Sequence, residues 1–221
     1  MNTKRNNFDI IKKGYAAQPK SLSPRLTEGT LFLVQSISAN KSQYVFDPLE
    51  NASQRADELR LNINDEFTIT QFGVFLYGTV QDQANASTTS QLLTEIPFEL
   101  LAVGQSLKAG NLFAGAVDIL VNNIKYVEKY DIRKCNMAQF GRLTTQGNTG
   151  FNFATDGMDD LAPMVTLSGA KKNQINVNLP DSMASFTFDV VGATQTMTYT
   201  IDKIAVLMRG LNAQNAAKFQ G

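Results

Sequence analysis

The 221-residue chain contains no histidine, no tryptophan and a single cysteine. The absence of histidine excludes Ser-His-Asp and Cys-His catalysis and any zinc site built on imidazole ligands. The lone cysteine, Cys135, excludes an intrachain disulfide and CxxC clusters, so the fold does not rely on an oxidising compartment. Because no histidine is present to activate it, we interpret Cys135 as a small buried apolar residue.

Other signatures of chemistry are also missing. The sequence has neither a GxxxxGK[ST] phosphate loop nor a GxGxxG dinucleotide motif. Without tryptophan, and with only scattered tyrosines, it offers no aromatic platform for stacking sugars or bases. The one acidic cluster with a glycine, ATDGMDD, contains Asp156, Asp159 and Asp160 but lacks the spacing of a calcium loop, which favours a solvated loop. We therefore predict a protein that is not an enzyme, with no catalytic residue, cofactor, metal or small-molecule substrate.

Charge is scarce as well. Charged residues make up 18% of the chain and the formal net charge is zero, so no overall field points to a nucleic-acid partner. Asn, Gln, Ser and Thr fill the gap, which suits either a surface that packs against neighbours or an ordinary all-β domain. No run approaches the ~18 apolar residues of a membrane span, and the polar N-terminus has no secretion signal. We expect a protein made and folded in a cytoplasm.

The first 25 residues form a basic head. They hold six lysines and arginines against Asp9 alone. Apolar residues at helical spacing within the head predict a short amphipathic helix near residues 7–17. Either this segment is an arm that reaches a neighbouring subunit, a membrane or a genome, or it is a local helix on its own domain. The residues assigned to such an arm are Lys4, Arg5, Phe8, Ile11, Lys12, Lys13 and Tyr15.

The remainder reads as short strands separated by Gly, Pro and Asn turns, typical of antiparallel sandwiches or barrels. The expected strands include residues 43–46, 59–63, 124–132 and 185–191, and residues 92–103, which contain Pro97, are expected to form an edge strand or an extended segment. The clearest strand signal is residues 65–78, DEFTITQFGVFLYG, in which apolar residues alternate with polar ones. The alternation slips by one residue at Gln71–Phe72, which predicts a β-bulge between two strand segments.

A second copy of this plan occurs at residues 196–210, TMTYTIDKIAVLMRG. Phe67 and Tyr199 are 132 positions apart, and at the same offset the alternation slips again at Lys203–Ile204. The agreement suggests an internal duplication, although any two strand units share some of this pattern. The predicted core of the repeated strands is Phe67, Ile69, Phe72, Val74, Leu76, Tyr199, Ile201, Ile204, Val206 and Met208.

Taken together, the duplicated block, the basic head and the histidine-free, Asn/Gln/Thr-rich composition resemble the double jelly-roll major capsid proteins of small tailless phages with an internal membrane. The resemblance implies an all-β chain of two antiparallel jelly-roll β-sandwiches side by side, with an N-terminal arm. The expected divisions are an arm at 1–30, a first sandwich at 31–106, a second at 107–211 and a tail at 212–221.

The same resemblance implies a virion protein that assembles into an icosahedral shell. Its partners would be itself, as a pseudo-hexagonal homotrimer with lattice contacts, and other capsid proteins such as a penton. The arm would face the internal membrane or the genome. Other virion β-sandwiches remain open, namely a tail tube, a penton or a single jelly-roll subunit. A carbohydrate-binding module is a further alternative from a different class.

Overall fold

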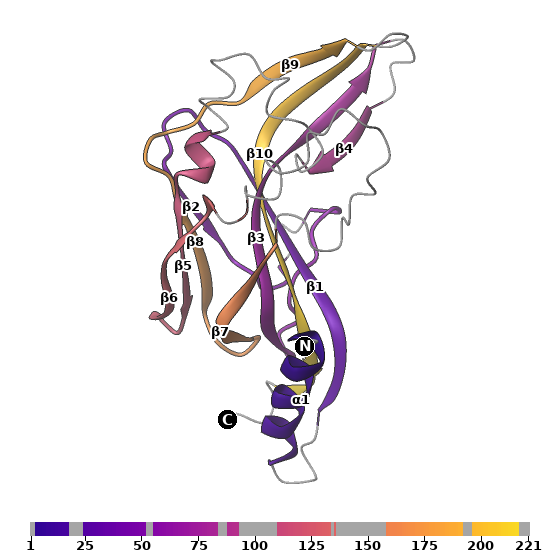
Figure 1. The fold of residues 1–221 in the computed structure, drawn as a ribbon, viewed down its shortest axis with the longest axis vertical. Coiled ribbons are helices and arrows are strands. Elements are labelled where there is room, and N and C mark those ends of the chain that lie inside the picture. The colour runs from indigo at the N-terminus through magenta and orange to yellow at the C-terminus, as the bar shows by residue number, and fades with distance from the viewer. Residues whose placement is uncertain are drawn as a thin grey trace.

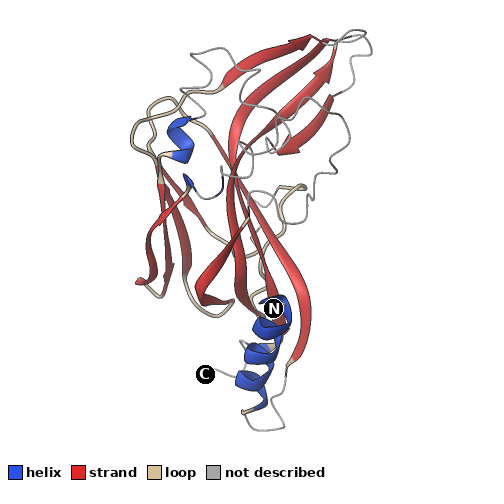
Figure 2. Cartoon of the chain, viewed as in Figure 1, coloured by secondary structure: helices blue, strands red, loops and turns tan. Residues whose placement is uncertain are grey.

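The computed structural model describes residues 3–17, 24–51, 55–83, 88–92, 110–133, 135, 158–191 and 196–216. Within these ranges the chain is mostly β-structure in antiparallel sheets, as the alternating sequence predicted, and Figures 1 and 2 show two sheets facing each other. The longer helix, α1 (Thr3–Ala16), lies outside the sheets and beside their lower end, and a short helical turn at residues 110–113 precedes β5. The expected helix near residues 7–17 is therefore present and starts one turn earlier.

The first sheet is built around two long strands. β3 (Glu66–Asp82) and β10 (Thr196–Gln214) pair along almost their whole lengths. β1 (Arg25–Ser36) and β9 (Phe186–Val191) pair with successive parts of β10, while β7 (Asp159–Ser168) and β4 (Thr88–Leu92) pair with successive parts of β3. The second sheet has the order β2 (Gln43–Phe46), β8 (Asn173–Asn178), β5 (Ala116–Val121) and β6 (Ile124–Asp131).

The strand pairs are nested along the chain. β1 pairs with β10, β2 with β8, β3 with β7, and β5 with its hairpin partner β6. A chain paired in this way is one long antiparallel ribbon, and the β3–β10 and β5–β8 pairings roll that ribbon into two facing sheets. Eight strands joined in this order form a single jelly roll, to which β4 and β9 add an extension at the upper ends of β3 and β10.

The two repeated blocks form the central strands of the first sheet. They correspond to β3 and β10, which are paired neighbours in one sheet and not the cores of separate sandwiches. The predicted phase slips are real β-bulges, located at Thr70 on β3 and at Asp202 on β10. Both bulges lie one or two residues before the predicted positions, and the offset between them is the same as in the sequence repeat.

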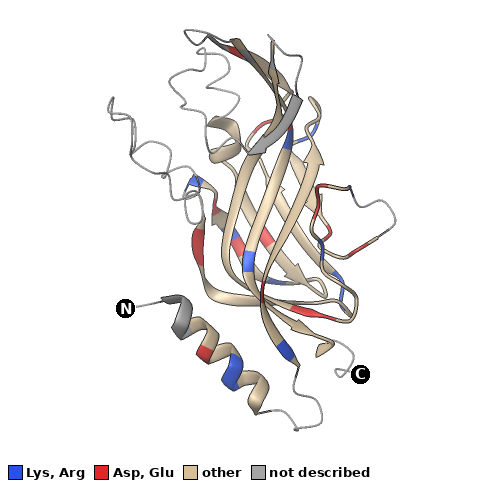
Figure 3. Cartoon of the chain, turned by 90° about the vertical axis from the view of Figure 1, so that its right-hand side faces the viewer, with Lys and Arg blue, Asp and Glu red and all other residues tan. Residues whose placement is uncertain are grey.

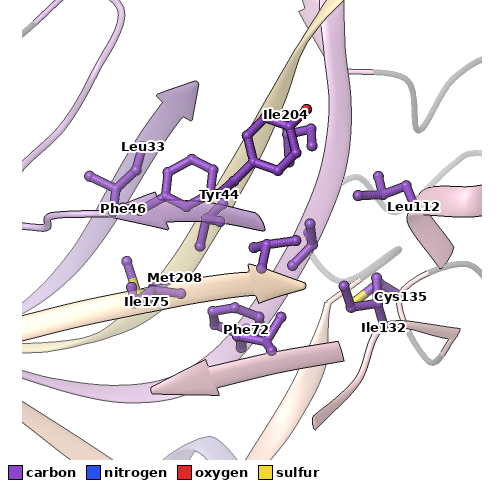
Figure 4. Close-up of a cluster of buried hydrophobic side chains, with 14 of the residues drawn as sticks. Leu33, Tyr44, Phe46, Phe72, Leu112, Ile132, Cys135, Ile175, Ile204 and Met208 are labelled. Carbon is purple, nitrogen blue, oxygen red and sulfur yellow. The ribbon is translucent and has the colours of Figure 1, made fainter. Parts of the chain in front are cut away.

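A single hydrophobic core fills the space between the sheets. Figure 4 shows Tyr44 and Phe46 of β2 and Ile175 of β8 meeting Phe72 of β3 and Met208 of β10. Of the ten predicted core residues nine are buried and Tyr199 is partly buried. Cys135 is also buried in this core and makes no disulfide, as its isolation in the sequence suggested.

The expected division into two sandwiches is not confirmed by these strands. A boundary at residue 106 places β3 and β10 in different halves, yet they share the longest pairing among the described strands. It also separates β2 from β8, which are neighbours in the second sheet. The described strands therefore form one sandwich from both halves of the chain, because jelly-roll pairing joins residues that are far apart in sequence.

Candidate functional site

Helix α1 packs on the outer face of the first sheet, the face turned away from the second sheet, and Figure 3 shows it as a separate layer there. The helix buries one apolar side chain, Ile11, which is 8% exposed. One turn later the Tyr15 hydroxyl donates a hydrogen bond to Glu66 Oε2 at 2.7 Å. Glu66 is itself buried, so the helix covers a carboxylate on this face of the sheet. The attachment of α1 thus rests on a small number of contacts.

The pKa of Tyr15 is changed at this contact with Glu66. Burial, and then the hydrogen bond and negative charge of Glu66, raise the pKa of Tyr15 well above its ordinary value. The neutral phenol is therefore the form that the docked helix requires. Beneath the helix, the Thr68 and Thr166 hydroxyls hydrogen-bond to each other at 2.9 Å, which satisfies two further polar groups on the covered face.

The predicted arm residues divide between the two sides of α1. Ile11 and Tyr15 face the sheet, and Phe8 lines a cleft beside it. Lys12 and Lys13 are exposed. For Lys4 and Arg5 the backbone belongs to α1, and their side chains lie outside the described part of the chain. Between an extended arm and a local helix, which the sequence left open, the structure places a helix on its own domain.

A cleft of about 640 Å³ lies between the N-terminal half of α1 and the sheet. Its floor includes a row across three strands, in which Thr30 of β1 pairs with Arg209 of β10 and Arg209 pairs with Gln71 of β3. Glu28 and Phe8 also line it. No hydrogen bond or ion pair joins the Arg209 guanidinium or the Glu28 carboxylate to any residue in the described ranges, so both charges are available to a partner.

One part of the β1 edge is closed by the chain itself. Phe32 and Leu59 exchange two backbone hydrogen bonds, and the Val34 amide next along the edge donates to Glu58 Oε1 at 2.9 Å. Burial alone raises the pKa of Glu58, but the amides of Arg55 and Val34 and the guanidinium of Arg60 outweigh it, so the pKa lies below its ordinary value. A buried carboxylate thus replaces a neighbouring strand and keeps this edge from pairing with another chain.

The β5–β6 hairpin carries exposed apolar side chains at the edge of the second sheet. Asn122 and Asn123 have φ values of 52° and 62°, as a type I′ turn requires. Beyond the turn, Ile124 is 61% exposed and Tyr126 is 55% exposed. The hairpin is fixed at its base because Asp118 Oδ1 accepts the Lys129 amide at 2.8 Å.

The acidic cluster from the sequence is partly described. Asp159 accepts a short hydrogen bond of 2.5 Å from the Tyr130 hydroxyl, and Asp160 accepts one of 3.0 Å from the side-chain amide of Gln71. Burial and the bond to Asp159 raise the pKa of Tyr130. Asp156 lies outside the described residues. Within the described ranges no group of three or more His, Cys, Asp or Glu side chains is arranged to hold a metal ion.

Sequence reasoning missed the charged residues that matter most for this surface. Glu58 and Glu66 look like surface charges in the sequence, yet both are buried. For Glu66, its place at the start of the strongest strand pattern is the only signal, and it does not reveal that a helix covers it. Arg209 gave no signal because its importance comes from the cleft around it.

The comparisons with known proteins add no relatives. No family model matches the chain, and no curated protein or solved structure matches it either. Among the described helical residues, none forms a helix long and apolar enough to cross a membrane.

Proposed function

We propose that this chain is a structural subunit of a virion, which self-assembles through its jelly-roll sandwich into a shell. The observation that carries the proposal is the nested eight-strand pairing, an architecture that recurs in viral capsid proteins as well as in lectins and cupins. The absence of histidine and tryptophan from the sequence disfavours the metal sites and aromatic sugar platforms of those other classes.

The subunit that we propose has one sandwich. A pseudo-hexagonal trimer needs two sandwiches in each chain, whereas the described strands share a single core. The single jelly-roll alternative is therefore favoured over the double jelly-roll that the sequence suggested. Shells of such subunits are held by many contacts that are individually weak and add up through repetition. Other capsid proteins, such as a penton, are the remaining protein partners in this proposal.

In this proposal, only the exposed side of α1 can contact a membrane or a genome. Its side chain Ile11 is buried against the sheet, whereas Lys12, Lys13 and Ile10, which is 58% exposed, lie on the exposed side. Contact with an anionic surface would then combine the charges of the lysines, which salt screens, with the exposed apolar side chain of Ile10. The location that follows is the virion, with synthesis in the host cytoplasm.

The test is the assembly state of the purified chain. We expect sedimentation velocity to show association that increases with concentration, and negative-stain microscopy to show rings, capsomers or closed shells. A single monomeric species at every concentration, up to the solubility limit and at both low and high salt, would overturn the proposal.

A further inference from the structure

We propose that the β5–β6 hairpin of one copy inserts into the cleft under α1 of a second copy, with Glu128 pairing with Arg209. The inference rests on the proposed self-assembly and specifies the contact that produces it. The contact would join the cleft that contains Arg209 to the exposed residues of the hairpin. Within the described part of one molecule, neither surface is covered by another segment.

The first feature is the unsatisfied charge in the cleft. Arg209 is half-buried on the cleft floor between Thr30 and Gln71, and no described residue neutralises it. A partly buried cation without a partner is unfavourable, and arginine is the residue that pairs best with a carboxylate at an interface. Phe8 and Leu211 supply apolar surface in the same cleft. The cleft therefore fits a partner that carries a carboxylate beside apolar side chains.

The β5–β6 hairpin has those groups. The side chain of Glu128 is 63% exposed and has only a distant ion pair, at 3.7 Å from Lys125. An exposed pair of this kind contributes little, so exchanging it for Arg209 costs little. Ile124 and Tyr126 lie on the same strand and are more than half exposed. Lys129 is also exposed, and its ammonium group has no partner among the described residues, so it provides a cation for Glu28 in the same cleft.

The hairpin is also rigid enough to act as a docking element. The type I′ turn at Asn122 and Asn123 fixes its tip, and Asp118 fixes the irregular backbone at Lys129, where φ is 51°. Lys125 is held by Asp118 as well, at 3.2 Å. A preorganised hairpin loses little conformational entropy on binding.

The contact has to form between copies. The cleft opens on the outer face of the first sheet, because Thr30 and Arg209 alternate with the core residues Leu31 and Met208. The hairpin belongs to the far edge of the second sheet, and Figure 1 shows it on the opposite side of the molecule from α1. A contact between two different surfaces is heterologous, so it repeats from copy to copy and builds rings or extended arrays.

A charge exchange on the full-length chain tests the inference. We expect Arg209→Glu and Glu128→Arg each to weaken self-association about tenfold or more in sedimentation, as loss of a partly buried ion pair does. The double variant Arg209→Glu/Glu128→Arg should recover most of the affinity, because it restores the pair with its signs reversed. Arg209→Gln, which removes charge without adding repulsion, should weaken association even if the reversal disturbs folding.

Exposed apolar residues provide the matched control. Tyr126→Ala should weaken association, whereas Leu59→Ser, at a residue that is 55% exposed and lies at the β1 edge, neither on the hairpin nor in the lining of the cleft, should leave it unchanged. If the unaltered chain associates and neither Arg209→Gln nor Glu128→Arg changes its affinity, the contact is wrong while self-assembly stands. If the unaltered chain does not associate at all, both this contact and the proposed function are overturned.

Discussion

Val74 on β3 pairs with Val206 on β10 at the midpoint between two β-bulges. The bulge at Thr70 precedes Val74 by the same number of residues as the bulge at Asp202 precedes Val206. The two strands are therefore related by a local two-fold axis at the valine pair. This symmetry explains why one sequence plan occurs twice, 132 positions apart, in two strands that lie side by side.

The same symmetry places two glycines opposite the bulges. Gly78 pairs with Ile201 and Gly210 pairs with Ile69, and a Cβ at either glycine would overlap the backbone carbonyl oxygen of Thr200 or Thr68. We expect Gly78→Ala and Gly210→Ala each to lower the free energy of unfolding by about 1–3 kcal/mol, measured by urea denaturation. Gly14→Ala is the control, because a Cβ there meets nothing within 4 Å and alanine favours the helix by about 0.5–1 kcal/mol. Equal effects at all three glycines would contradict this account.

Tyr15 should contribute to stability through Glu66. Tyr15→Phe keeps the ring but leaves the buried carboxylate without its hydroxyl donor. We expect a loss of about 1–3 kcal/mol in urea denaturation. Tyr126→Phe, on an exposed ring, should change stability by less than about 0.5 kcal/mol and serves as the control. An unchanged Tyr15→Phe variant would show that α1 is not held by this bond.

The raised pKa values of Tyr15 and Tyr130 predict that the folded state loses stability at alkaline pH. The pKa values of Tyr15 and Tyr130 are raised in the folded state above the ordinary value of 10.0, so folding favours their protonated forms. Their contribution to the free energy of unfolding is complete below about pH 10 and is lost as the pH rises from there toward the folded-state pKa values. We expect the urea midpoint to fall above about pH 10, and Tyr15→Phe with Tyr130→Phe to flatten that fall. Tyr126→Phe should leave the slope unchanged.

The lowered pKa of Glu58 predicts that the folded state loses stability at acid pH. Its pKa is lowered below the ordinary value of 4.5, so its contribution is present above that value and is lost as the pH falls through the folded-state pKa. We expect Glu58→Gln to reduce stability at pH 7 by about 1–3 kcal/mol, since hydrogen bonds to a charged acceptor are lost, and to reduce the loss on acidification. Glu28→Gln, on an exposed carboxylate with no described partner, should alter neither property.

Removal of residues 1–17 separates folding from assembly. The sandwich core contains no residue of α1, so we expect the strand signal in circular dichroism to remain. Deletion exposes Glu66 and removes the wall of the cleft formed by Phe8, so self-association should weaken. A chain that no longer folds after this deletion would show that α1 is part of the structural core.

The local features of the protein could be predicted from the order of its residues alone. Alternation of apolar and polar residues located strands at 43–46, 124–131 and 186–191 within about one residue, and the phase slips located both bulges. These features follow from the period of a β-strand, in which a side chain's neighbours in sequence decide which face it occupies. The predicted strand at residues 59–63 was wrong, because its residues make only isolated bridges from Leu59 and Leu61. The expected strand at residues 92–103 lies mostly outside the described residues.

Which strands are neighbours and which charges are buried depend on the folded chain and could not be predicted from the sequence. The repeat at β3 and β10 was consistent with two sandwiches or one, because strand pairing between residues more than a hundred positions apart leaves no local pattern. Glu58 and Glu66 became buried acceptors, and Arg209 became a cation in a cleft with no partner among the described residues, through chain segments that fold over them from elsewhere. Local alternation fixes the faces of a strand, whereas burial of a charge depends on which distant segment covers that face.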